Sequence, residues 1–265
     1  MSSRRLAAVV AHPDDDTFGC AGTVALHTND PDFHFVLIHV TSGESGQIAE
    51  GSDATPETLG EVREAEDRRS WEVLGRVPDR HEWLRVPDHA VADHDTDELV
   101  ERIATVLREE RPDVVMTFGP DGVTGHPDHI AVGEVATRAF HRVREEGVPG
   151  FSRLLHQAIP QSMLDRWNDE LVAKGQEPMD PTQMYQPRGV PDERVGVRVD
   201  CTGVAMRKLA AVREHVTQMD GTQEHIGDEA QQLQALAFET HVVAWPSTEP
   251  GAMVMTDVFE DLDIG

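Results

Sequence analysis

The chain has 265 residues, and its 49 acidic side chains outnumber its 23 basic ones, which gives a formal charge of −26 near neutral pH. A surface this negative repels nucleic acids and anionic membranes, so neither is an expected partner. The longest apolar runs, such as Leu6–Ala11, are far shorter than the roughly 20 residues of a bilayer span. That run is also too short for a secretory signal and is soon followed by aspartates. We therefore expect a cytoplasmic protein without a membrane span.

The basic residues are unusual in kind, because Lys174 and Lys208 are lysines and all the others are arginines. Excess carboxylate with little lysine suits a protein that works in concentrated salt, where repulsion between surface charges is screened. A genome whose base composition favours arginine codons would leave the same pattern. Both interpretations, salt adaptation and codon usage, stay open.

The first forty residues predict a strand, a helix and a second strand. Leu6–Val10 is a continuous apolar run, as expected for a parallel strand covered on both faces, and Phe33–Val40 is a second such run. Gly19–Leu26, between them, is compatible with a helix. A βαβ unit of this kind places its two strands side by side and parallel.

The alternation of strands and helices continues along the chain. In Asp95–Glu110, apolar residues form one stripe, and Asp95 and Glu98 have the spacing of a capping box. The pattern predicts one α/β domain with a Rossmann-like, mostly parallel sheet and helices on both faces. The further predicted strands are Glu82–Val86, Asp113–Phe118, Leu154–Ile159 and Arg194–Val199, and the further predicted helices are Pro56–Leu74, Asp95–Glu110, Ala131–Glu146 and Val204–Gln218.

A polar, proline-rich segment interrupts the alternation at about residues 160–191. It is too long for an ordinary connection between a strand and a helix. We interpret it as an irregular insertion over the single domain, with a short helix near Met163–Ala173.

The first motif with chemical content is Ala11-His12-Pro13-Asp14-Asp15-Asp16, directly after the first predicted strand. Ligands of open α/β sheets bind beyond the carboxyl ends of the strands, which is where this segment has to lie. His12 and Asp15 offer a nitrogen and an oxygen of the kinds that bind zinc. Taken alone, a run of aspartates is as compatible with a solvated turn or a helix cap.

A second cluster has the same arrangement and favours a metal site over a solvated turn or a helix cap. The strand Asp113–Phe118 leads into a glycine-rich loop and then into Gly125-His126-Pro127-Asp128-His129. If the two strands are neighbours, both His-Pro-Asp tripeptides meet in one crevice. Two histidines and one carboxylate with an open position form the kind of site used in metal-assisted hydrolysis. Other histidines show no ligand spacing and are interpreted as surface or packing residues: His34, His81, His94 and His241.

These motifs resemble those of the LmbE-like family of zinc-dependent deacetylases, which includes N-acetylglucosaminyl-phosphatidylinositol de-N-acetylase (PIG-L). The family hallmark AHPDDE is matched by Ala11–Asp16 with one departure, and GHPDH is matched by Gly125–His129. The similarity extends over almost the whole chain. Its other carriers are the loop from Thr41 to Gln47, Arg63 with Glu66, Pro87-Asp88, and the segment with Lys208, His215, Thr217 and Gln218.

The resemblance implies roles for individual residues. His12, Asp15 and His129 would hold one Zn²⁺ per chain. Asp14 would be the general base, and His126 a protonated partner that stabilises the oxyanion and helps the amine depart. Arg63 and Asp88 would recognise sugar hydroxyls, with surface ion pairing as the alternative. His215 would orient His126 or reach the substrate, with a structural histidine as the alternative. The roles that the resemblance implies fall on these positions: His12, Asp14, Asp15, Arg63, Asp88, His126, His129 and His215.

Two positions depart from the family pattern. Asp16 replaces the usual glutamate, which keeps the charge but shortens the side chain by one methylene. Thr124 stands two residues before His126, where mycothiol-type relatives carry a tyrosine. This second departure weakens an assignment to the mycothiol pathway.

The sequence therefore predicts a zinc-dependent hydrolase that removes an N-acetyl group from a small amino-sugar substrate or glycoconjugate of the N-acetylglucosamine type. The same amide chemistry on a thiol conjugate or an antibiotic intermediate is the alternative substrate class. A metal-binding or carbohydrate-binding protein without turnover is the alternative of another class, and the presence of Asp14 and His126 beside the expected metal argues against it. The oligomeric state is left open.

Overall fold

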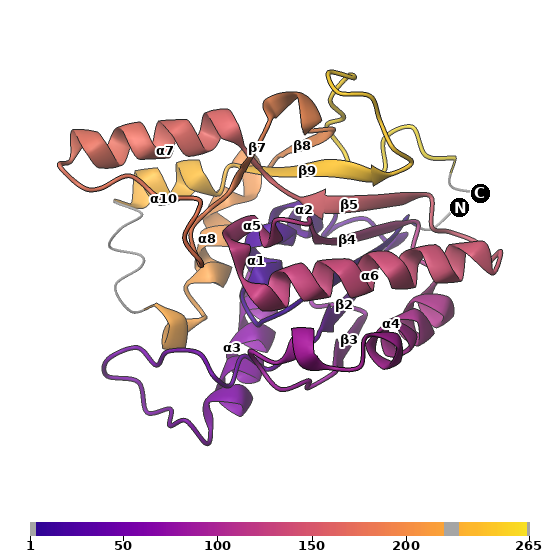
Figure 1. Ribbon diagram of the computed structural model, residues 1–265, viewed down its shortest axis with the longest axis horizontal. Coiled ribbons are helices and arrows are strands. Elements are labelled where there is room, and N and C mark those ends of the chain that lie inside the picture. Colours follow the sequence, from indigo (N-terminus) through magenta and orange to yellow (C-terminus); the bar gives the residue numbers. More distant parts are fainter. Residues whose placement is uncertain (1–3, 220–227, 264–265) are drawn as a thin grey trace.

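The structure, a computed structural model, describes residues 4–219 and 228–263. The described residues form a seven-stranded sheet in the order β3-β2-β1-β4-β5-β9-β8. Only β9 runs against its neighbours, and it pairs antiparallel with both β5 and β8 (Figure 1). The strands are β1 (Arg4–Val10), β2 (Phe33–His39), β3 (Arg80–Trp83), β4 (Val114–Phe118), β5 (Arg153–Gln157), β8 (Val197–Asp200) and β9 (Phe238–Trp245). The predicted α/β fold with a mostly parallel sheet is confirmed.

The helices lie on both faces of this sheet. Crossovers between parallel strands are right-handed, so a chain that steps from β1 to β3 in one direction and then returns to β4 and β5 places its helices on opposite faces. Figure 1 shows α4 and α6 in front of the sheet and α1, α2 and α8 behind it. The helices of these layers are α1 (Asp15–Gly19), α2 (Ala21–Leu26), α3 (Leu59–Leu74), α4 (Thr96–Glu110), α5 (Gly122–Gly125), α6 (Pro127–Glu145) and α8 (Ala205–Val212).

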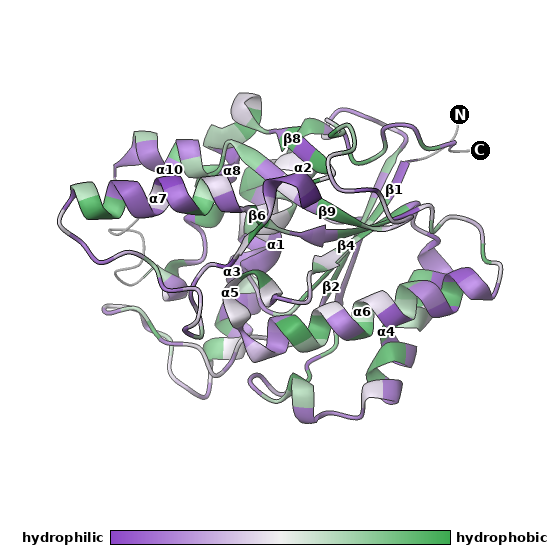
Figure 2. Ribbon diagram, turned by 45° about the horizontal axis from the view of Figure 1, so that its top comes forward, coloured by the Kyte–Doolittle hydropathy of each residue, from purple (hydrophilic) through white to green (hydrophobic). Residues whose placement is uncertain are grey.

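The apolar strands are buried as their sequences predict. From Leu6 to Ala11 every residue is buried, and the run pairs with the equally buried β2 through contacts such as Leu6 with Phe35. In Figure 2 green segments lie along the central strands, whereas green and purple alternate along α4 and α6. None of the helices in the described ranges has both the length and the apolar character for crossing a bilayer.

The proline-rich insertion begins and ends in a small parallel pair, β6 (Ile159–Pro160) and β7 (Gly189–Val190). The expected short helix is present as α7 (Gln161–Ala173). Arg188, just before β7, donates from its backbone nitrogen to the carbonyl of Val123 at 2.7 Å. The insertion therefore contacts the loop between β4 and α6.

The C-terminal third differs most from the expected elements. The sequence did not predict β9, because its first half contains the polar residues Glu239, Thr240 and His241, which the fold nevertheless buries. The strand expected at Arg194–Val199 is shifted to β8. The helix expected at Val204–Gln218 stops at Val212, and Val216–Gln218 forms a separate 3-10 turn. A further helix, α10, spans Glu229–Ala235.

One local prediction concerns the start of α4, where the Asp95 side chain accepts a hydrogen bond from the backbone nitrogen of Glu98 at 2.9 Å. Asp95→Ala leaves that helix-end donor without its acceptor and is expected to lower the free energy of unfolding by about 1 kcal/mol. Denaturant unfolding measures the change. Asp95→Ser keeps an oxygen at the cap and is the control, so equal losses in both variants would contradict the capping role.

Candidate functional site

The two His-Pro-Asp motifs meet at the carboxyl ends of β1 and β4, which are neighbours in the sheet. Here the strand order changes direction. β2 and β3 lie on one side of β1, whereas β4 and β5 lie on the other side. Such a reversal leaves a crevice between the loops that follow the two strands. The loop after β1 enters α1, and the loop after β4 leads through α5 into α6, which starts at Pro127 rather than at the expected Ala131.

His12, Asp15 and His129 present three donor atoms toward one point. Nδ1 of His12 lies 3.2 Å from Nε2 of His129 and 3.4 Å from Oδ2 of Asp15. Nε2 of His129 lies 3.2 Å from Oδ1 of Asp15. Tetrahedral zinc with bonds of about 2.0–2.2 Å holds its donors about 3.3–3.5 Å apart, so the set fits such an ion.

Hydrogen bonds to the protein fix these three donors. Nδ1 of His129 donates to the carbonyl of Gly122 at 3.0 Å, which leaves Nε2 as the free acceptor. The backbone nitrogen of His12 donates to Oδ2 of Asp15 at 2.8 Å. The imidazoles and the carboxylate are therefore held in place without the ion.

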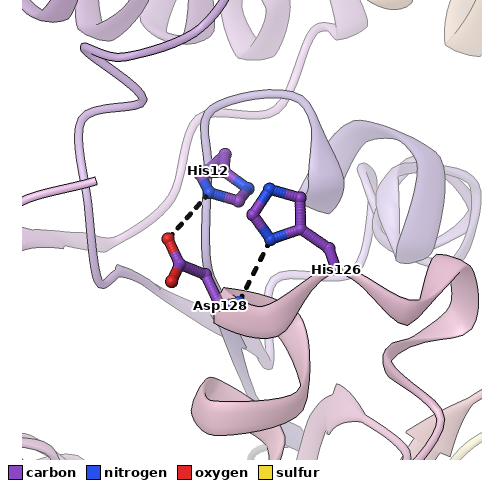
Figure 3. A group of neighbouring side chains, drawn as sticks. All are labelled: His12, His126 and Asp128. Carbon is purple, nitrogen blue, oxygen red and sulfur yellow. Dashed lines mark hydrogen bonds and ion pairs between the residues drawn. The ribbon is translucent and has the colours of Figure 1, made fainter. Parts of the chain in front are cut away.

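The far nitrogen of His12 faces two further carboxylates. Nε2 lies 3.0 Å from Oδ1 of Asp88 and 3.5 Å from Oδ2 of Asp128, and Figure 3 shows Asp128 in contact with both His12 and His126. Asp128 also accepts from the backbone nitrogen of His89 at 2.7 Å. Although burial opposes the charged imidazole, Asp128, Asp15 and Asp88 together raise the pKa of His12 well above its usual value. This accumulation of negative charge favours a bound cation.

Asp14 lies beside the three donors in a strained backbone conformation, with φ at 117° and ψ at −36°. Arg63 supports it: one guanidinium nitrogen donates to the carbonyl of Pro13 at 2.7 Å and to Oδ2 of Asp14 at 3.2 Å. Burial raises the pKa of Asp14 to about 7, Arg63 lowers it, and the Asp15 charge adds to the rise. Because the side chain is still 24% exposed, the carboxylate remains within reach of a substrate.

Gly43 makes room for the Arg63 guanidinium. A Cβ atom at this position would lie 2.2 Å from a guanidinium nitrogen, and the backbone φ of +64° is in the left-handed region that favours glycine. The second guanidinium nitrogen donates to the Gly43 carbonyl at 2.9 Å. The loop after β2 is therefore shaped around the arginine that supports Asp14.

His126 caps the N-terminus of α6, with Nδ1 accepting from the backbone nitrogen of Asp128 at 3.1 Å. An accepting Nδ1 places the proton of the neutral ring on Nε2. Burial and the neighbouring His12 and His129 lower the pKa of His126 to about 4. These neighbours favour the neutral ring, which offers one N–H donor, and the protonated His126 that the resemblance implies stays a prediction. Tyr185 of the insertion packs edge-on against it, with ring centroids 4.9 Å apart.

The three residues expected to bind the substrate are all buried and bonded within the protein. Arg63 holds the Asp14 turn. Asp88 accepts from the backbone nitrogens of Ser45 at 3.0 Å and His89 at 2.9 Å, in addition to its contact with His12. His215 lies beyond the end of α8, and its Nε2 lies 3.0 Å from the Thr17 hydroxyl rather than on His126. In this arrangement the three side chains position the loops of the site.

Sequence reasoning missed the parts that Asp128 and Tyr185 have in this site. The last position of the second His-Pro-Asp tripeptide hinted at Asp128, because the same position in the first tripeptide is Asp14. Nothing in the sequence pointed to Tyr185, which lies 59 positions from His126 in the irregular insertion.

Comparison with known protein sequences also connects this chain with deacetylases. The family described as GlcNAc-PI de-N-acetylase (PIG-L) matches residues 7–140, which contain all three donors. A 1D-myo-inositol 2-acetamido-2-deoxy-alpha-D-glucopyranoside deacetylase of Salinispora arenicola is 32% identical over 83% of this chain and 77% of its own length.

Two solved structures share the fold at lower identity. N,N'-diacetylchitobiose deacetylase from Pyrococcus horikoshii is 20% identical, with a TM-score of 0.60 over 94% of this chain and 85% of that one. GalB of Pseudomonas putida, a 4-carboxy-2-hydroxymuconate hydratase, is 16% identical, with a TM-score of 0.62 over 94% and 98%. Since one neighbour is a deacetylase and the other a hydratase, these likenesses support the fold alone. The family match and the identity to the Salinispora deacetylase go further, and the chain belongs to the PIG-L (LmbE-like) family of deacetylases.

Proposed function

We propose that the protein is a zinc-dependent hydrolase that removes an N-acetyl group from an amino sugar or glycoconjugate of the N-acetylglucosamine type. The observation that carries this proposal is the convergence of His12 Nδ1, Asp15 and His129 Nε2 at 3.2–3.4 Å from one another. Asp14 lies next to these donors and keeps its carboxylate partly exposed. A binding protein without turnover has no use for such a base.

His12, Asp15 and His129 would hold the zinc ion, which would polarise an amide carbonyl and lower the pKa of a bound water toward 7. The protein contributes the proton transfers. Asp14 takes a proton from the attacking water while the water oxygen forms a bond to the acyl carbon. The same carboxyl group then returns a proton to the amide nitrogen as the C–N bond breaks. The products are acetate and a free amine.

His126 takes a different part in this proposal from the one that the sequence suggested. Its neutral ring donates a hydrogen bond from Nε2 to the acyl oxygen as negative charge develops there. Arg63 keeps Asp14 in the required orientation through its hydrogen bonds to Pro13 and Asp14. Asp88 and Asp128 lie 3.0 and 3.5 Å from Nε2 of His12, so their negative charges face the side of this ring away from the proposed ion. Direct sugar contacts by Arg63, Asp88 and His215 are not part of the proposal.

Release of acetate from N-acetylglucosaminides tests the proposal. The purified protein is expected to contain zinc and to lose activity with a chelator, and His129→Ala is expected to lose both the ion of this site and turnover. The control is His34→Ala, which removes a histidine from the opposite end of β2. A His129→Ala variant with wild-type turnover would overturn the assignment, and turnover restricted to thiol conjugates or antibiotic intermediates would replace the substrate class.

Other expectations from the sequence stay predictions. They are the cytoplasmic location, the adaptation to salt and the exclusion of nucleic acids, each of which rests on the charge of −26 and the residue pattern.

A further inference from the structure

A second group of metal-binding side chains lies behind the catalytic loop. It consists of His39 at the end of β2, His81 in β3 and Asp67 in α3. His81 shows no ligand spacing in the sequence, which predicts a surface or packing residue; its ring does pack against His39 and Trp83, and its Nε2 also lies near Asp67. In the β2–β3 register His81 pairs with Leu37, so His39, two residues further on, points to the same face as His81.

The donor atoms of this group are close enough to share one ion. Nε2 of His81 lies 3.0 Å from Nδ1 of His39 and 3.6 Å from Oδ2 of Asp67. One donor from each residue lies within 4.8 Å of the others. The two separations from His81 bracket the spacing of about 3.3–3.5 Å expected around tetrahedral zinc, and the shortest contact between His39 and Asp67, from Nε2 to Oδ1, is 3.7 Å.

Asp67 is the most informative member. Its side chain is fully buried and contacts the Asp16 carboxylate, and among the residues that the structure describes no donor group makes a well-formed hydrogen bond to either of its oxygens. Most buried polar atoms in proteins are satisfied, because an unpaired one costs several kcal/mol or shifts its pKa. Burial and the adjacent charge of Asp16 raise the pKa of Asp67 well above its usual value. The carboxyl group therefore needs either a proton or a cation.

Asp16 supplies the outer support that such an ion requires. Its Oδ1 lies 3.3 Å from Nε2 of His39, the nitrogen opposite Nδ1, and its Oδ2 accepts from the Trp71 indole at 2.7 Å. A carboxylate on the far nitrogen of a histidine is the usual partner of a metal-binding imidazole. Asp16 Oδ1 also accepts from the backbone nitrogen of Asp14 at 3.3 Å, which links the group to the catalytic loop.

We propose that His39 Nδ1, His81 Nε2 and Asp67 Oδ2 bind a second divalent ion of the zinc class. Two imidazoles and one carboxylate suit zinc, cobalt or nickel rather than magnesium or calcium. The His81 side chain is 16% exposed while His39 and Asp67 are fully buried, so the ion enters from the His81 side. This ion stabilises the packing of α3 against β2 and β3 and holds Asp16 beneath Asp14.

Metal analysis of the full chain separates this site from the catalytic one. After equilibration with excess Zn²⁺ and gel filtration, the wild type is expected to hold one ion more than Asp67→Asn. The wild type is likewise expected to hold one ion more than His129→Ala. The variant that combines both substitutions is expected to hold neither ion, and His34→Ala should match the wild type. If Asp67→Asn and His81→Ala both retain the wild-type zinc content, the proposal is wrong.

Trp83 offers a second measurement that does not depend on activity. Its ring stacks on His39 with centroids 4.3 Å apart and lies 4.5 Å from His81. Co²⁺ at this site is expected to quench the fluorescence of Trp83 in the wild type and in His129→Ala, but not in His81→Ala or Trp83→Phe. Equal quenching in His81→Ala and the wild type would overturn the proposal and leave Asp67 as a protonated acid.

Discussion

Asp14→Asn is expected to lower kcat by about 10²–10⁴-fold while zinc remains bound. The amide keeps the size of the side chain and can still accept from Arg63, which lies 3.2 Å from Oδ2, but it cannot take a proton from water. His12, Asp15 and His129 are unchanged in this variant. Acetate release and zinc content, measured on the same preparation, check the prediction. Turnover within a factor of a few of the wild type would contradict the role of Asp14 as general base.

The strained backbone of Asp14 supplies a control with the opposite effect on stability. A φ of 117° is unfavourable for a residue with a side chain and costs about 1–3 kcal/mol, whereas glycine adopts it freely. Asp14→Gly removes both the strain and the base. It is expected to be as inactive as Asp14→Asn but more resistant to denaturant than either Asp14→Asn or the wild type. Loss of activity together with a gain in stability would show that the site keeps an unfavourable backbone conformation for the sake of catalysis.

Lys208→Ala is expected to lower the free energy of unfolding by about 3–5 kcal/mol, because it leaves a buried carboxylate without its cation. Lys208 is buried in α8, and its Nζ donates to Oε1 of Glu239 at 2.6 Å and to the carbonyl of Phe18 at 2.8 Å. Glu239 also accepts from the backbone nitrogens of Gly22 and Thr23 at the start of α2, at 2.7 and 2.8 Å. The pair therefore joins β9, α2 and α8.

The control for Lys208→Ala is Arg213→Ala, since Arg213 forms an exposed ion pair with Glu229 that is worth about 0–1 kcal/mol. Similar losses in the two variants would contradict the account.

The dependence of the free energy of unfolding on pH gives a second check. Burial favours the neutral acid, but Lys208 and Thr23 hold the pKa of Glu239 below its usual 4.5. The pair's contribution is therefore present above that pH and is lost as the pH falls through the lower pKa of the folded state.

The position of the candidate metal site was predictable from the sequence because local features determine it. His12 and Asp15 follow β1 directly, and His129 lies in the first turn of the helix after β4. A strand that ends in such a motif presents it at the carboxyl edge of the sheet, and adjacent strands bring two motifs together. For the same reason the parallel half of the sheet could be predicted from its continuous apolar runs.

The features that could not be predicted depend on contacts between distant segments. Glu239 makes β9 look polar, and only its buried partner Lys208 makes the strand compatible with the core. The helix expected to reach Gln218 ends early because Glu66 of α3 accepts from the backbone nitrogen and hydroxyl of Thr217, at 2.8 and 2.6 Å. The charge of His126 depends on burial and on two neighbouring rings, which no motif encodes.

The pairing of β6 with β7 has a consequence for how this enzyme family diversifies. Ile159 lies beside Gly189 and Pro160 beside Val190, so the insertion leaves and re-enters the domain at adjacent points. A segment with adjacent ends can be lengthened, shortened or exchanged at small entropic cost, because loop closure depends only weakly on length. The three proposed zinc ligands all lie before the insertion, between residues 12 and 129. Transplanting a relative's insertion between Pro160 and Gly189 is therefore a direct route to a new substrate range on an unaltered metal centre.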